Sequence, residues 1–275
     1  MHQTLGFIGG GNMAASLIGG LIADGWPADR IYVSDPDAAR REHLSELFSV
    51  HTDAQNERII ELCSTILLAV KPQLMASVIN PLKSAIKQYE PLIITIAAGI
   101  RLGDLSRWSD NYHKLIRSMP NTPALLQSGA TALYADPAVS NDDKAIAETI
   151  MRAVGITLWV NKEADMDAVT ALSGSGPAYF FYVMQALEEA GVKLGLDEET
   201  ARLLTLQTAF GAAKMALEST DSPEGLRGKV TSPGGTTEQA IQSLQQNELM
   251  EIFNQALHAA HQRSQQLAEE HGLQT

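Results

Sequence analysis

The sequence predicts two domains, an α/β domain with a mostly parallel sheet followed by an all-α domain. From Thr4 to Val160, short apolar runs rich in β-branched residues alternate with segments of helical period. Such runs, apolar on both faces, are typical of parallel strands covered by helices. From Lys162 onward these runs stop, and apolar residues recur every three or four positions, as in amphipathic helices. We therefore expect domains at residues 1–161 and 162–275.

The composition and the net charge indicate an ordinary cytoplasmic protein with small-molecule ligands. The 275 residues carry a formal charge of −12, which disfavours a large binding surface for nucleic acid or anionic lipid. No apolar run reaches membrane-spanning length, and the N-terminal residues lack the pattern of a secretory leader. The sequence therefore predicts neither a nucleic-acid partner nor a membrane partner.

Neither the cysteine nor the histidines indicate a redox or metal site. Cys63 is the only cysteine and lies in an apolar run, ELCSTILLAV, which we interpret as a strand with an inert thiol. His258 and His261 are close in sequence, but no third ligand lies near them. We expect no metal site.

The first apolar run leads into a glycine-rich turn and then into a helical segment. In LGFIGGGNMAASLIGGL, Gly9, Gly11 and Ala14 have the G-x-G-x-x-A spacing, with Asn12 and Met13 between them. Gly9 would allow the tight turn, Gly11 a close approach of backbone to a pyrophosphate, and Ala14 close packing of helix on strand. A plain structural turn is the alternative, but the order of strand, glycines and helix favours a dinucleotide-binding site.

The choice of dinucleotide depends on the end of the second apolar run, IYVSD. It ends at Asp35, and an acidic residue there usually binds the adenosine ribose, which favours NAD. Ser34, Arg40 and Arg41 lie close by and would bind a 2′-phosphate if Asp35 turned away. A solvated helix face is the alternative interpretation of the two arginines. The choice between NADP and NAD therefore stays open here.

The later apolar runs end in small or turn-forming residues. The carboxyl ends of parallel strands meet at one edge of a sheet, where ligands bind in open α/β folds. The runs AVKPQ, ITIAAGI and RSMPNTPAL are thus expected to line the nicotinamide end of the cofactor, although a lysine there also suits a solvated strand end. The candidate cofactor contacts are Ala69, Val70, Lys71, Pro72, Ala97, Ala98, Gly99, Met119, Pro120, Asn121 and Thr122.

Two breaks rich in Gly, Ser and Pro interrupt the helical half. In SGSGPAYFF, Pro177 suits the first turn of a helix, and Ser173 or Ser175 suits its cap. In TSPGGTTEQAI, the Gly234–Gly235 pair lets backbone approach a ligand, and Thr236 or Thr237 would cap the following helix. From these residues alone, each break is either a helix corner or a site where free N–H groups bind an anion.

Several of these segments, taken in order, resemble the pyrroline-5-carboxylate reductase family. GFIGGGNMA, AVKPQ, TIAAG, MPNTPAL, SGSGPAY and SPGGTT carry the resemblance over about residues 5–265. It implies an N-terminal Rossmann domain, a C-terminal dimerisation domain and reduction of 1-pyrroline-5-carboxylate to L-proline, the last step of proline biosynthesis. It also implies NADPH as the preferred cofactor with NAD as the alternative, and a homodimer that assembles into a pentamer of dimers.

The resemblance also implies roles for the two breaks. Ser175, Gly176 and Pro177 would lie against the nicotinamide and the substrate ring, and Asn56 matches a family position near the adenosine ribose. A protonated imine already attracts hydride, so positioning and one hydroxyl suffice, for which Thr237 is the catalytic candidate. The substrate carboxylate is expected on Ser232, Gly234, Gly235, Thr236 and Thr237.

Two other functions compete with this one. A β-hydroxyacid dehydrogenase would need a catalytic lysine followed four residues later by asparagine, but Lys193 is followed by Asp197, and SPGGTT stays unexplained. A non-catalytic NAD(P)-binding regulator would keep the first domain, but it would not need two breaks in favourable helix. A further hypothesis is that each active site joins the first domain of one chain to a break of another.

Overall fold

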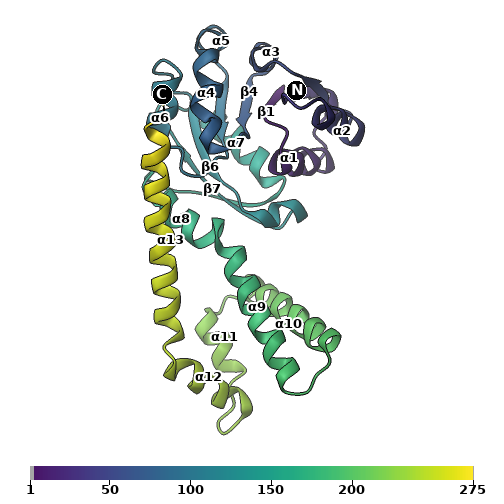
Figure 1. The fold of residues 1–275 in the computed structure, drawn as a ribbon, viewed down its shortest axis with the longest axis vertical. Coiled ribbons are helices and arrows are strands. Elements are labelled where there is room, and N and C mark those ends of the chain that lie inside the picture. The colour runs from purple at the N-terminus through teal and green to yellow at the C-terminus, as the bar shows by residue number, and fades with distance from the viewer. Residues whose placement is uncertain (1–2, 275) are drawn as a thin grey trace. The chain divides into compact units, whose positions relative to one another are not determined.

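The computed structural model describes residues 3–274, and its first part is built around one eight-stranded sheet (Figure 1). The strand order is β3-β2-β1-β4-β5-β6-β7-β8, and every neighbouring pair is parallel except β6 with β7. The first six positions have the strand order of a Rossmann fold. The strands are β1 (Leu5–Ile8), β2 (Ile31–Ser34), β3 (His51–Asp53), β4 (Thr65–Leu68), β5 (Leu92–Thr95), β6 (Leu115–Met119), β7 (Gly129–Ala135) and β8 (Gly155–Trp159).

Helices follow most of the strands, and after β8 the described chain contains helices only. The predicted fold class, a mostly parallel α/β part followed by an all-α part, is confirmed. The α-helices are α1 (Asn12–Ala23), α2 (Ala38–Phe48), α3 (Asn56–Leu62), α4 (Met75–Ile79), α5 (Lys83–Tyr89), α6 (Leu102–Trp108), α7 (Asn141–Arg152), α8 (Asp165–Val169), α9 (Gly176–Lys193), α10 (Glu198–Glu218), α11 (Pro223–Lys229), α12 (Thr236–Gln246) and α13 (Leu249–Gly272).

Two apolar cores form on the two faces of the sheet. On one face, α1, α2 and α7 contribute side chains such as Leu17, Leu44 and Ile150 to a core around Phe7 of β1. On the other face, α3 to α6 pack over β4 and β5, with Met75 among the fully buried side chains. Each large apolar side chain buried in this way contributes about 1.5–3 kcal/mol to folding. The cores fix the carboxyl ends of the strands, where the candidate cofactor contacts lie.

The chain forms two compact units whose limits differ from the expected domains. One unit runs through the sheet to Ser175 and takes up the chain again from Ala260, and the other spans Gly176–Ala259. The boundary therefore falls after residue 175 rather than after residue 161, because α8 and the π-helical turn Thr170–Gly174 pack with the sheet.

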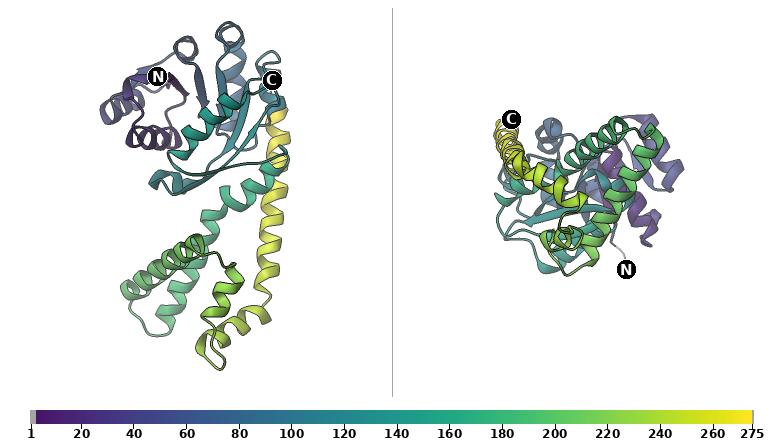
Figure 2. Two further views of the ribbon diagram at one scale, coloured as in Figure 1. Left: turned by 180° about the vertical axis from the view of Figure 1, so that it is seen from behind. Right: turned by 90° about the horizontal axis from the view of Figure 1, so that it is seen from below.

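The last turns of α13 belong to the sheet-bearing unit. Ser264 Oγ donates to Asp167 Oδ1 at 2.7 Å, and both residues are buried. Arg107 Nη2 donates to the Gly272 carbonyl, and Trp108 Nε1 donates to the Gln274 carbonyl at 3.0 Å. Figure 1 shows the end of α13 beside α6, the helix that carries both donors, and Figure 2 shows the same end of the chain, marked C, in two further views. Three hydrogen bonds therefore hold the end of α13 to this unit.

The helical unit leaves many large apolar side chains exposed. Its helices α9 and α10 pack against each other, but their outer faces are rich in Phe, Tyr and Leu. Such a surface on a folded protein marks an interface. The residues are Phe180, Phe181, Tyr182, Leu187, Leu203, Leu204, Phe210, Met215 and Leu217. No helix among residues 3–274 is long and apolar enough to cross a membrane.

Candidate active site

The turn after β1 requires glycine at residue 9. Gly9 has a φ of +100°, and a Cβ atom there would lie 2.8 Å from the Ala69 carbonyl oxygen. At Gly11, the N-cap of α1, a Cβ atom would meet no described atom within 4 Å. Ala14 is fully buried behind this turn. The open backbone at Gly11 and the start of α1 fit a pyrophosphate, which binds at such helix N-termini.

The Asp35 carboxylate faces the glycine-rich turn. Its Oδ2 accepts a hydrogen bond from the Gly10 N–H at 2.8 Å, and its Oδ1 accepts one from the Asp37 N–H at 2.9 Å. Hydrogen bonds to an ionised acceptor are among the stronger ones in proteins. Both carboxylate oxygens are therefore engaged by backbone donors of the protein.

The two arginines of α2 contact the turn and the end of β2. Arg40 Nε donates to the Gly10 carbonyl, and its Nη2 donates to Asn12 Oδ1 at 2.9 Å. Arg41 Nη1 donates to the Asp35 carbonyl at 2.7 Å and to the Pro36 carbonyl at 3.1 Å. The interpretation of both arginines as a solvated helix face is therefore wrong.

Ser34 is less suited to a phosphate than the sequence indicated. It is fully buried in β2, and its Oγ donates to the Phe7 carbonyl at 3.3 Å. A buried hydroxyl with a partner inside the sheet is not accessible to a ligand. This placement argues against Ser34 as a side-chain ligand of the cofactor.

The end of β4 lies next to the glycine-rich turn, and the end of β5 follows on the other side of β4. The Ala69 N–H donates to the Ile8 carbonyl at 2.8 Å, and Val70 Cγ1 lies 3.0 Å from the Cβ position of Gly9. Lys71 is exposed, and Pro72 opens the short helix Pro72–Leu74. Ala97, which follows β5, is buried, Ala98 is partly exposed, and Asn56 is the partly exposed first residue of α3.

Gly99 has a structural role that the sequence did not indicate. It is buried with a φ of +70°, and a Cβ atom there would lie 3.2 Å from His271 Cδ2 and 3.5 Å from the Ala268 nitrogen. The end of α13 therefore packs on the loop after β5, and this packing needs the small residue.

The MPN segment and the SGSG segment come together in the sheet-bearing unit. Asn121 Nδ2 donates to the Ser173 carbonyl at 3.1 Å. The Met119 methyl group fills the space where Gly174 would carry a Cβ atom. Pro120 is buried, and Thr122 is exposed at the start of the short helix Thr122–Leu126.

The start of α9 agrees with the sequence in one respect and differs in another. Gly176 begins the helix and Pro177 lies in its first turn, as predicted. Of the two predicted cap residues, Ser173 does not cap α9, because its Oγ donates backward to the Val169 carbonyl at 3.1 Å. Ser175 lies between the π-helical turn and α9.

The SPGGTT loop lies within the helical unit. Gly235 is the N-cap of α12, and Thr236 and Thr237 are its first two residues, so the prediction that a threonine caps this helix is wrong. Gly234 has a φ of +72°, and its N–H donates to Glu238 Oε2 at 2.8 Å. Glycine at the cap position leaves the first N–H groups of α12 without a side-chain acceptor from the cap, as an anion site requires.

Sequence reasoning missed a buried ionic cluster behind β6. Arg117 is 2% exposed and lies 3.5 Å from Glu163 Oε1, which also accepts the Leu102 N–H at 2.7 Å. Burial lowers the pKa of Arg117, and the charges of Glu163 and Asp167 act in the opposite direction. The signal was present as a charged residue inside the apolar run HKLIRSM, but its partners are distant in sequence.

The structure also shows the position of Cys63 and the distribution of possible metal ligands among the described residues. Cys63 is the C-cap that follows α3 and does not lie in a strand, and burial raises the pKa of its thiol to about 12. Among residues 3–274, no three His, Cys, Asp or Glu side chains gather closely enough to hold a metal ion.

The Rossmann strand order, the glycine turn and the open N-terminus of α1 define a nicotinamide-dependent oxidoreductase. Residues 4–99 match the family model described as NADP oxidoreductase coenzyme F420-dependent, and residues 163–267 match that described as pyrroline-5-carboxylate reductase dimerisation. The pyrroline-5-carboxylate reductase of Pseudomonas aeruginosa is 52% identical over 98% of each chain. The chain belongs to the pyrroline-5-carboxylate reductase family.

Solved structures support the same assignment. The pyrroline-5-carboxylate reductase of Coxiella burnetii has a TM-score of 0.93 at 44% identity, covering 97% of this chain and 98% of that chain. The Plasmodium falciparum enzyme, solved with NADP bound, has a TM-score of 0.85 at 30% identity, with the same coverage. The predictions of an NAD(P)H-dependent reductase of proline biosynthesis and of a homo-oligomer with a dimerisation domain are confirmed.

The two competing functions lose their support. Asp197, which would replace the asparagine of a β-hydroxyacid dehydrogenase, is the N-cap of α10 and accepts the Thr200 N–H at 2.9 Å. Lys193 and Asp197 thus stand on either side of a helix–helix turn. A regulator without catalysis does not account for a likeness to reductases over nearly the whole chain.

Proposed function

We propose that the cofactor lies along the carboxyl edge of the sheet, with its pyrophosphate on Gly9–Gly11 and the N-terminus of α1. The support is the open backbone at Gly11 beside a turn that only glycine can make. The ligand position at the strand-order reversal between β1 and β4 is the usual one for this fold. The residues expected at the nicotinamide end are Val70, Lys71, Pro72, Ala97, Ala98, Met119, Pro120 and Thr122, and Asn56 is expected near the adenosine ribose.

We propose NADPH as the preferred cofactor. Asp35 is held by the Gly10 and Asp37 N–H groups, so its carboxylate is directed toward the turn. Arg40 lies over the same turn and offers a guanidinium that suits a 2′-phosphate. A neutral 2′-hydroxyl offers no comparable charge to this arginine.

We propose that the SPGGTT loop binds the substrate carboxylate. The first turn of α12 supplies N–H donors, Gly234 and Gly235 allow the backbone to approach the carboxylate, and Ser232, Thr236 and Thr237 supply hydroxyl groups. Ser175, Gly176 and Pro177 are the proposed wall beside the substrate ring. These assignments rest on the residue types and on the uncapped start of α12.

In the proposed mechanism, the protein positions the two reactants and does not supply a strong acid. Reduced nicotinamide supplies a hydride to the imine carbon when it is bound. The protein holds the substrate carboxylate on the α12 N-terminus, and Thr237 Oγ orients the ring by a hydrogen bond. Fixing two reactants in this way lowers the barrier substantially, because their freedom is already lost on binding.

Substitution of Thr237 tests this site. For Thr237→Ala, we expect kcat/KM for 1-pyrroline-5-carboxylate to fall about 10- to 100-fold, the worth of one hydrogen bond to a charged or developing group. The affinity for NADPH, measured by fluorescence titration, should stay unchanged. Thr149→Ala, on an exposed position of α7, is the matched control and should behave as the wild type. Equal kinetics in the two variants would remove Thr237 from the site.

The assembly beyond a homo-oligomer is also proposed. The exposed apolar faces of α9 and α10 suit a second copy of the chain, which gives a homodimer. Five such dimers in a closed assembly are the further step that the family resemblance implied. Active sites shared between two chains are proposed because the motifs are spread over both halves of the chain. A cytoplasmic location is also proposed, as the sequence indicated.

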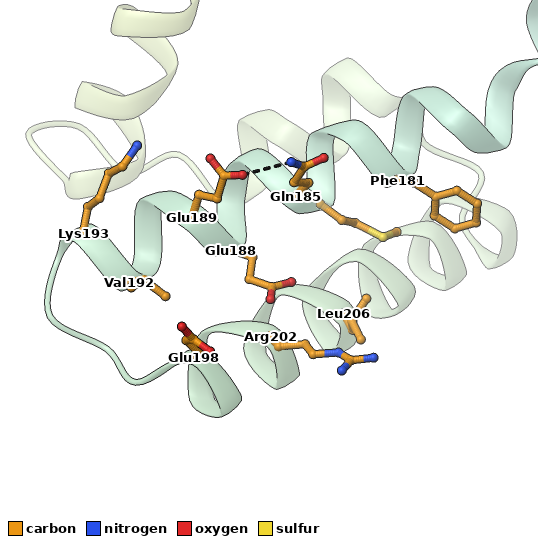
Figure 3. A pocket seen from close by; sticks show the side chains of 10 residues that line it. Phe181, Gln185, Glu188, Glu189, Val192, Lys193, Glu198, Arg202 and Leu206 are labelled. Atoms are coloured by element: carbon orange, nitrogen blue, oxygen red, sulfur yellow. Dashed lines mark hydrogen bonds between the residues drawn. The ribbon is translucent and has the colours of Figure 1, made fainter.

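The helical unit contains a groove that none of the proposed site residues line. It lies between α9 and α10, has a volume of about 640 Å³, and combines Phe181, Val192 and Leu206 with the charged Glu188 and Arg202 (Figure 3). Within it, Gln185 Nε2 donates to Glu189 Oε1 at 2.9 Å. We assign this groove to the proposed contact with a second copy rather than to the substrate.

A further inference from the structure

The carbonyl group of Ser173 cannot be paired as in a regular helix. An α-helix would pair it with the N–H group of residue 177. That residue is Pro177, which has no N–H group. The chain here also changes from the π-helical turn Thr170–Gly174, in which the Ser175 N–H donates to the Thr170 carbonyl, to α9.

Asn121 supplies the missing donor. Its Nδ2 donates to the Ser173 carbonyl at 3.1 Å, while its Oδ1 accepts the Ala130 N–H at 2.9 Å. Because a backbone N–H can only donate, the bond from Ala130 identifies the amide oxygen and leaves Nδ2 toward Ser173. The amide therefore joins the first part of β7 to the turn that precedes α9.

A second contact fixes the same turn. The Met119 methyl group occupies the space next to Gly174, where a Cβ atom would overlap with it. Met119 and Asn121 are two residues apart and act on two consecutive residues of the turn. The segment Met119–Asn121 thus determines where residues 173–175 lie.

We propose that Asn121 is a positioning residue, which fixes the turn at residues 173–175 and through it the start of the pocket wall at Ser175. Its side-chain amide serves this turn rather than a contact with the cofactor. The inference rests on the proposed function in one respect, since it takes Ser175–Pro177 as part of the substrate pocket. Misplacement of such a wall by about 1 Å lowers the rate on the order of 10²-fold.

The test uses Asn121→Asp in the full-length oligomer. The aspartate keeps an acceptor for the Ala130 N–H but loses the donor and places a negative charge beside the Ser173 carbonyl. We expect faster hydrogen exchange in peptides covering residues 170–176, and a fall in kcat on the order of 10²-fold with little change in the Kd of NADPH. Asn80→Asp is the matched control at a partly exposed helix end, and it should change neither exchange nor kinetics.

A second pair of variants tests the reason for the contact. Pro177→Ala restores an N–H group at residue 177, so Asn121→Ala should lower kcat less in the Pro177→Ala background than in the wild type. Equal effects in the two backgrounds would overturn the role given to the proline. A weaker Kd for NADPH with unchanged exchange would overturn the proposal in favour of direct cofactor contact.

The result for Asn121→Asp can be interpreted independently of the result for Thr237→Ala, which tests the proposed substrate site. Faster exchange without a loss of kcat in Asn121→Asp would overturn the positioning role, whatever Thr237→Ala shows. A loss of kcat in Asn121→Asp together with wild-type kinetics in Thr237→Ala would support the positioning role and reject the threonine.

Discussion

At the scale of single residues, the backbone of Gly10 in the nucleotide turn is held by two side chains of opposite charge. Asp35 accepts the Gly10 N–H, and Arg40 donates to the Gly10 carbonyl. Asp35, which in the sequence favours NAD, therefore binds the backbone of the glycine-rich turn. Asp35 directly follows β2, and from this position its carboxylate reaches the N–H groups of both Gly10 and Asp37.

The different contacts of the two arginines lead to a prediction on cofactor preference. Arg40→Ala should weaken the binding of NADPH roughly 10- to 100-fold relative to NADH, because one charge-assisted contact to phosphate is lost. Arg41→Ala should change this ratio much less, since Arg41 donates to the carbonyls of Asp35 and Pro36 and not to the glycine-rich turn that Arg40 contacts. Fluorescence titration of both variants with both nucleotides measures the ratio. An equal loss of NADPH and NADH binding in Arg40→Ala would contradict a role in reading the 2′-phosphate.

At the scale of elements, α13 is long enough to contribute to both compact units. Its last turns bring Ser264 to the buried Asp167, and Ala268 and His271 to Gly99. The loop after β5, where cofactor contacts are proposed, is therefore packed against a helix from the end of the chain. This arrangement explains a glycine in a left-handed conformation at residue 99.

The buried hydroxyl of Ser264 is expected to matter for stability. Ser264→Ala removes a hydrogen bond to a carboxylate that is 4% exposed, which should lower the free energy of unfolding by about 1–3 kcal/mol. Ser219→Ala removes a comparable bond to the partly exposed Asp221 and should cost less than about 0.5 kcal/mol. Urea unfolding followed by tryptophan fluorescence compares the two, since Trp108 donates to the Gln274 carbonyl. Equal losses of unfolding free energy in the two variants would show that the burial of Asp167 does not strengthen its hydrogen bond with Ser264.

The elements were predictable where apolar runs are dense. The six apolar runs LGFIG, IYVSD, STILLAV, LIITIAA, HKLIRSM and ITLWV correspond to β1, β2, β4, β5, β6 and β8. The sequence did not predict β3, which is a short polar edge strand, HTD, or β7, whose residues GATALYA are mostly small. β7 forms through its antiparallel pairing with β6, and this pairing depends on residues outside the β7 segment itself.

At the scale of the whole molecule, the helical unit needs a partner. Leu203 and Phe210 of α10 are 60% and 63% exposed and are seven residues apart, which places them on one face of the helix. A surface of this kind is buried in a homo-oligomer. The dimerisation model that matches residues 163–267 covers the same helices.

Charges on that face should separate the subunits. We expect the double variant Leu203→Asp, Phe210→Asp to be monomeric by light scattering and to lose activity, if two chains share each active site. Leu47→Asp, on α2, is the control, since Leu47 is also 59% exposed but belongs to the sheet-bearing unit. A monomeric double variant with wild-type activity in dilute solution would contradict a shared site.

The candidate site could be predicted from the sequence only in its separate pieces. The motif at Gly9–Ala14 has a local cause, because its turn and helix are made by neighbouring residues. The bond from Asn121 to Ser173 spans 52 positions, and the ion pair of Arg117 with Glu163 spans 46. The residue pattern within one segment gives no information about contacts between residues so far apart in the sequence. The cap of α12 was mispredicted because threonine is a good cap on average, whereas Gly235 occupies this position.

The discontinuous make-up of the sheet-bearing unit has a consequence for synthesis on the ribosome. Residues up to Ser175 emerge first, but Ser264, Gly272 and Gln274 complete their contacts only after the whole helical unit has been made. At about 5–20 residues per second, the sheet spends several seconds with its docking site for α13 uncovered. A chain cut short within the helical unit would leave Asp167 without the Ser264 hydroxyl and Trp108 without its carbonyl. Completion of the nascent chain is thus coupled to completion of the nucleotide-binding fold.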